Sequence, residues 1–145
     1  MNFDSDRATL LSLQGSMAYD EGNYINAENK YQNAYELEAS TGRILGIVDT
    51  LFYVGLMRYK NGDFLEAHKA FDESLRHARE NNMPNMQIKN YIGIALTQKT
   101  SENNALYCHT LERAERLHTN DITYLPATEA LIRELDCPYP PLNLE

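Results

Sequence analysis

The sequence lacks the features of membrane-spanning and secreted proteins. No apolar run approaches the roughly 18 consecutive residues that a transmembrane helix needs, so we expect no membrane partner. The only two cysteines, Cys108 and Cys137, do not form a C-x-x-C pair and do not indicate a disulfide scaffold. Residues 1–6 are mostly polar and acidic and lack the apolar core of a signal peptide. We therefore expect a cytoplasmic protein.

Positive charge is also scarce. The chain carries 13 lysines and arginines against 21 aspartates and glutamates, which gives a net charge of −8. The basic residues are scattered among acidic ones, whereas a nucleic-acid-binding protein usually presents a basic patch or stripe. An acidic field also repels phosphate. We therefore expect no nucleic-acid partner.

Residues that could carry catalysis or hold a metal are few and poorly spaced. The four histidines follow no recognised metal-binding spacing; they are His68, His77, His109 and His118. Cys108 precedes His109 directly, and adjacent residues on a helix point about 100° apart, so the two do not form a nucleophile–base pair. No glycine-rich phosphate loop or nucleophile motif is present. We expect no enzyme, no metal and no cofactor.

The chain contains an internal repeat. Residues 11–34 resemble residues 51–74 at an offset of 40. The identical pairs are Leu11/Leu51, Gly15/Gly55, Met17/Met57, Tyr19/Tyr59, Gly22/Gly62 and Ala27/Ala67. Similarity at a fixed period of this size predicts a repeat architecture, which usually functions through a surface. The 145 residues, 43% of them hydrophobic, suffice for a single continuous core.

The spacing within each copy predicts a helix, a tight turn and a second helix. Small and aromatic residues recur at offsets of three, four and seven, which place them on one helix face. Gly22 and Gly62 end the first helix of each copy, and Asn23 and Asp63 are expected to cap the next helix. The aromatic pair Tyr31/Phe71 is expected to fill the gap between repeats.

This pattern resembles the tetratricopeptide repeat (TPR). The matching motif is Gly-x-x-x-Tyr-x-x-Gly-x-Tyr/Phe-x-x-Ala-x-x-x-Tyr/Phe-x-x-Ala/Ser, present twice. The usual TPR period is about 34 residues; the longer period here is similar to that of Rap-type bacterial regulators and Pins/LGN adaptors. The resemblance implies an all-α superhelix of about three helix-turn-helix repeats with a capping helix. It also implies a non-enzymatic protein- or peptide-binding adaptor or regulator.

The third copy is degenerate. A polar run at 99–104 replaces the glycine-aromatic turn, and two helices of other ancestry are the alternative. A capping helix is expected at about 126–136. The proline-rich tail at 137–145 is expected to be extended, either frayed or docked on a groove. The predicted repeats span about 8–41, 48–81 and 88–121, within one domain at 1–136.

The TPR resemblance also implies a concave groove lined by the first helix of each repeat. The corresponding positions are Ser12, Ser16, Tyr19, Phe52, Leu56, Tyr59, Ile92, Leu96 and Lys99. They lack the Lys, Asn and Arg set by which some family members hold a C-terminal carboxylate. An apolar groove with tyrosines suits an amphipathic helix or an extended peptide. The alternative is a groove closed by the chain's own terminal segments.

A second functional hypothesis is self-association. The size, acidity and repeat number are also similar to those of small chaperones of bacterial secretion systems, although those usually keep the shorter period. On this hypothesis the chain forms a homodimer through its apolar face or its tail.

Overall fold

The fold is a linear array of helices. The computed structural model describes residues 3–100 and 104–119. These form α1 (Phe3–Asp20), α2 (Tyr24–Thr41), α3 (Ile44–Lys60), α4 (Phe64–Glu80), α5 (Pro84–Thr100) and α6 (Asn104–Thr119). No strand occurs in these two ranges, and the predicted all-α class is confirmed.

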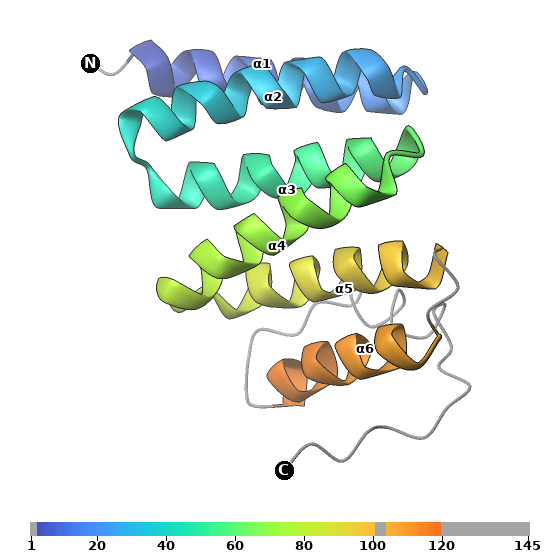
Figure 1. Cartoon of the computed structure of the whole chain (residues 1–145). Coiled ribbons are helices and arrows are strands. Elements are labelled where there is room, and N and C mark those ends of the chain that lie inside the picture. Colours follow the sequence, from blue (N-terminus) through green and yellow to red (C-terminus); the bar gives the residue numbers. More distant parts are fainter. Residues whose placement is uncertain (1–2, 101–103, 120–145) are drawn as a thin grey trace.

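Successive helices pair and stack. The pairs α1–α2, α3–α4 and α5–α6 lie one below another from the N-terminal end (Figure 1), and each helix packs against the next. The pairs begin at Phe3, Ile44 and Pro84, four or five residues before the repeat boundaries expected from the sequence. The predicted turn of the third repeat falls largely on 101–103. That turn, the predicted cap at 126–136 and the tail at 137–145 lie outside the described residues.

Glycine ends the first helix of the first two pairs. Gly22 and Gly62 have φ of 77° and 85°, in the left-handed region that favours glycine. After α1, the Gly22 N–H donates to the Tyr19 carbonyl at 2.9 Å and the Asn23 N–H to the Ala18 carbonyl at 2.9 Å. This is the Schellman arrangement, which satisfies carbonyls at a helix end. The predicted end of the helix at Gly22 and Gly62 is confirmed.

The two predicted N-caps differ. The Asn23 side chain accepts a hydrogen bond from the Asn26 N–H at 3.2 Å, as expected. Asp63 occupies the same position before α4, but its side chain makes no capping bond, so that part of the prediction is wrong. The backbone at Asp63 still closes the turn, because its N–H donates to the Arg58 carbonyl at 2.9 Å.

The connections between helix pairs also repeat at an interval of 40 residues. The sequence alone did not lead us to expect this. Gly42 precedes α3 with φ of 71°, and Asn82, 40 residues later, precedes α5 with φ of 51°. Asparagine tolerates the left-handed region better than most residues with a side chain. The repeat thus includes the connections between pairs as well as the pairs themselves.

An aromatic ring on the second helix of a pair rests on a glycine of the first. A Cβ on Gly15 would lie 2.9 Å from the Tyr31 ring, and one on Gly55 would lie 2.8 Å from the Phe71 ring. Phe71 also meets Gly93 of the following pair, where a Cβ would lie 2.7 Å away. Phe71 is therefore enclosed between α3 and α5, and its predicted role between repeats is confirmed.

A buried polar chain links three successive helices. Ser74 on α4 donates to the Val48 carbonyl on α3 at 2.8 Å. Asn90 on α5 donates to the Ser74 hydroxyl at 2.8 Å and to the Met86 carbonyl at 2.9 Å. Both Ser74 and Asn90 are fully buried, so these bonds fix the positions of α3, α4 and α5 relative to one another.

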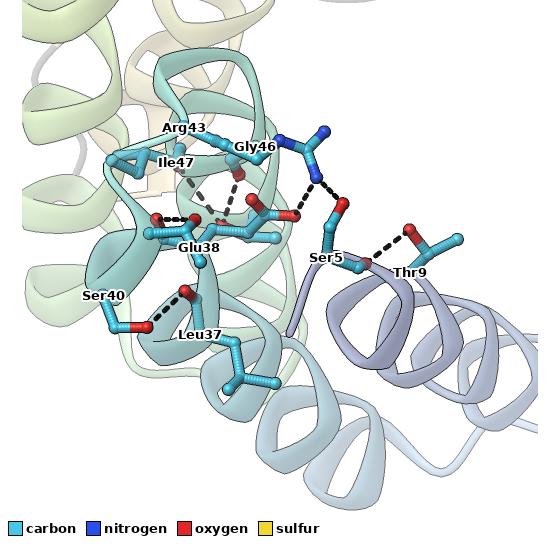
Figure 2. A network of polar contacts seen from close by, with 10 residues as sticks. Ser5, Thr9, Leu37, Glu38, Ser40, Arg43, Gly46 and Ile47 are labelled. Carbon is cyan, nitrogen blue, oxygen red and sulfur yellow. Dashed lines mark hydrogen bonds and ion pairs between the residues drawn. The ribbon is translucent and has the colours of Figure 1, made fainter. Parts of the chain in front are cut away.

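A single arginine joins the first three helices. Figure 2 shows the Arg43 guanidinium between the Glu38 carboxylate of α2 and the Ser5 hydroxyl of α1. The Arg43–Glu38 ion pair measures 3.6 Å, and Glu38 is buried. Gly46 leaves room for this carboxylate, because a Cβ at that position would overlap it. Arg43 therefore holds the start of α1 against the α2–α3 junction.

We expect Gly55→Ala to destabilise the protein. Alanine gains about 1 kcal/mol of helix propensity, but overpacking a closed core costs about 1–3 kcal/mol. Phe71 cannot retreat, because Gly93 bounds its other side. Because the enclosed Phe71 ring places the overpacking cost at the upper end of this range, the free energy of unfolding from urea titration should fall by about 1–2 kcal/mol. The control Asn33→Ala, at an exposed position of α2, should be neutral or slightly stabilising. Equal stability of wild type and Gly55→Ala would contradict this packing.

Candidate functional site

Four of the predicted groove residues line one cleft between α1 and α3. Its volume is about 410 Å³. The predicted residues in its lining are Ser12, Ser16, Tyr19 and Leu56. The sequence reading did not identify the other lining residues, which are Thr9, Leu13, Asp20, Tyr31, Tyr53 and Met57.

The other two predicted residues of α3 are half-buried and do not line this cleft. The Phe52 ring lies 5.7 Å from that of Phe71 and 5.3 Å from that of Tyr53, measured between ring centroids. The Tyr59 ring lies 5.6 Å from that of Phe64. Both side chains therefore contribute to packing, so their substitution would change stability as well as any binding.

The predicted residues of the third repeat lie apart from the cleft. Ile92 is only 3% exposed and belongs to the core around Phe71, so it offers no surface to a ligand. Leu96 is half-buried against the same core. Lys99 is exposed, with its ammonium 5.8 Å from the centre of the Tyr107 ring.

Two stacked tyrosines form part of the cleft wall. The Tyr31 and Tyr53 ring centroids are 4.9 Å apart, with an angle of 13° between the ring planes. Tyr31 reaches this position because Gly15 allows its ring to pass close to α1. Tyr53 has no aromatic counterpart at the matching positions, Leu13 and Gly93, so the repeat pattern gave no signal for it.

The difference between Tyr53 on α3 and the matching Gly93 on α5 explains why the cleft is open only in the first half of the array. Gly93 lets α5 approach the Phe71 ring, and α3 and α5 contact each other directly. At the matching position α3 carries Tyr53, whose ring stands against Tyr31. No comparable direct packing joins α1 and α3 within the described chain. The α1–α3 half of the array thus contains a cleft, whereas the α3–α5 half is a packed core.

Burial and nearby carboxylates raise the pKa of Tyr31 and of Tyr53. Burial is the largest cause that raises the pKa of Tyr31, to about 12, and the nearby Tyr53, Asp49 and Asp20 add to it. A hydrogen bond with Ser16 acts in the opposite direction. Burial and then Asp49 also raise the pKa of Tyr53. Both phenols are therefore hydrogen-bonding groups without charge at physiological pH.

The charge in and around the cleft is negative. Among the described residues that line the cleft, Asp20 is the only carboxylate, and there is no lysine, arginine or histidine. Asp49 acts on both tyrosines from nearby. Burial raises the pKa of the Asp49 carboxyl, and the charge of Lys89 opposes this rise. Hydroxyl groups, apolar surface and negative potential together suit a ligand with aliphatic and cationic parts.

Elsewhere the described residues offer little for catalysis. They contain no group of three His, Cys, Asp or Glu side chains that could hold a metal ion. His68 Nδ1 lies 3.2 Å from the Thr97 hydroxyl, within a packed contact between α4 and α5. Cys108 is 4% exposed and packs in the third pair, as expected, but it is disulfide-bonded, which its sequence spacing did not indicate. No helix in the described ranges is long and apolar enough to cross a bilayer.

No protein-family model matches this chain, and no curated protein matches it either. The resemblance to TPR proteins therefore remains a prediction that depends on the repeated residues. The packing of the helix pairs and the chemistry of the cleft provide the remaining basis for a functional proposal.

The high pKa of Tyr31 predicts a stability change in alkali. Since the folded protein favours the neutral phenol, its contribution to stability is complete below pH 10.0 and is lost as the pH rises toward about 12. Tyr31→Phe should remove this loss, which we expect to be about 1–3 kcal/mol. The measurement is the free energy of unfolding of both proteins across this pH range. Parallel curves for the two proteins would show that Tyr31 does not resist ionisation.

Proposed function

We propose that this chain is a non-enzymatic adaptor or regulator that binds a segment of a partner protein in the α1–α3 cleft. The proposal includes membership of the TPR family, which the repeated residues and the stacked helix pairs support. The observation that carries the binding role is the cleft itself. It is open, and it contains the predicted positions Ser12, Ser16 and Tyr19.

The size of the cleft favours a short segment as ligand. Its volume of about 410 Å³ lies in the range of small-ligand pockets and accommodates a few side chains. A folded domain would require a larger complementary surface. A partner helix or an extended peptide therefore fits, with one or two side chains inserted between α1 and α3.

The lining selects among such segments. Leu13, Leu56 and Met57 offer apolar contact, while Thr9 and Ser12 offer hydroxyl groups. The absence of a basic residue from the lining, together with the Asp20 carboxylate, disfavours an acidic ligand and favours lysine or arginine. The net charge of −8 adds long-range attraction for a basic partner.

We therefore expect the chain to select basic, aliphatic peptides. Immobilised wild-type protein should recover, from a random peptide library, sequences enriched in lysine or arginine next to leucine, isoleucine or valine. Asp20→Lys should weaken a selected peptide by about 10-fold or more in a titration, equivalent to about 1.4 kcal/mol.

The matched control is Asp72→Lys, which makes the same charge change at an exposed position of α4. It should leave the affinity within about twofold, since only long-range attraction is altered. Circular dichroism establishes that each variant is folded. Recovery of peptides without basic enrichment, or equal weakening by both variants, would exclude the cleft as the recognition site.

A further inference from the structure

The outer face of α1 carries an apolar stripe. Phe3, Leu10, Leu13 and Met17 are 66%, 55%, 59% and 63% exposed. Their spacing of seven, three and four residues is that of the seam by which one helix packs along another. Residues 8–19 include no charged side chain, although 23% of the whole chain is charged. This face therefore has the composition of a helix contact.

The matching faces of the other pairs are buried. Met57 is the repeat equivalent of Met17 and is 1% exposed, where Met17 is 63% exposed. Thr50 and Asn90, which match Leu10 in the second and third pairs, are 3% and 0% exposed. In the second and third pairs this face packs against the preceding helix pair. On α1, which lies at the end of the array (Figure 1), the same face has no helix of the described chain against it.

Three of the four residues of the stripe are symmetric about Leu10, whereas Leu13 would face Arg7 of the other copy. Phe3 lies seven residues before Leu10 and Met17 lies seven residues after it. If a second α1 runs antiparallel with Leu10 opposite Leu10, Phe3 of each copy meets Met17 of the other. This is the self-complementarity that a two-fold interface requires. Asp6 would lie opposite Gln14, so no carboxylate is placed against another at these positions.

We propose that two copies of this chain form a closed dimer through antiparallel pairing of α1, with the two-fold axis at Leu10. The stripe shares only Leu13 with the cleft, so Leu10 and Met17 test the dimer without altering the cleft lining. This inference does not depend on what the cleft binds.

The first test is the mass of the full-length chain in sedimentation equilibrium. Wild type should reach twice the chain mass of 16.6 kDa as its concentration rises. Leu10→Asp and Met17→Asp should each weaken association by about 100-fold or more, because each places an unpaired charge in an apolar seam. Leu65→Asp is the matched control, since Leu65 on α4 is 70% exposed, and it should leave the dimer intact.

The second test addresses the geometry. Leu10→Asp and Leu10→Lys should each be monomeric alone. An equimolar mixture should form a heterodimer, because opposite charges then meet at the axis. Three outcomes overturn the proposal: a wild type that stays monomeric at high concentration, growth into open-ended polymers, or a mixture that fails to associate. Thermal melts monitored by circular dichroism verify that the variants are folded.

Discussion

The contact between an aromatic ring and a glycine determines how closely the helices of this protein approach. Gly15 and Gly55 have no side chain where Tyr31 and Phe71 cross them, so each ring lies nearly against a helix backbone. This contact sets the distance between paired helices. The opposite side of each ring then packs against the next pair. These rings set the spacing between helices at which the turns, the caps and the buried hydrogen bond between Asn90 and Ser74 form.

Tyr31 and Phe71 lie in different surroundings because the helix that follows each pair differs at one position. Phe71 is covered by Gly93 and needs no polar partner, which suits a phenylalanine. Tyr31 is met by Tyr53 instead, and its hydroxyl interacts with Ser16 beside the cleft. A buried phenol needs such a partner, and a tyrosine therefore belongs where the interface is not fully closed. The same repeat thus yields a packed core on one side of α3 and a cleft on the other.

The sequence predicted the features that depend on local periodicity. The all-α class, the ends at Gly22 and Gly62 and the placement of Phe71 follow from spacing along single helices. The features it missed depend on how helices meet in space. Tyr53 carried no repeat signal, because its role comes from facing Tyr31. Ile92 was expected in the groove, yet the close approach of α5 to α4 buries it. Asn82 was overlooked, since it replaces a glycine whose function lies in backbone conformation rather than in chemistry.

In this array each helix mainly contacts its sequence neighbours. Its stability is a sum of pair energies and junction energies, as in other linear repeat proteins. The α3–α5 part is held by its buried polar link, and α1 and α2 join the rest through the α2–α3 junction, which the Arg43–Glu38 and Arg58–Glu28 ion pairs reinforce. A ligand that touches both α1 and α3 would bridge this junction, and its binding energy would appear as cooperativity between the two parts of the array.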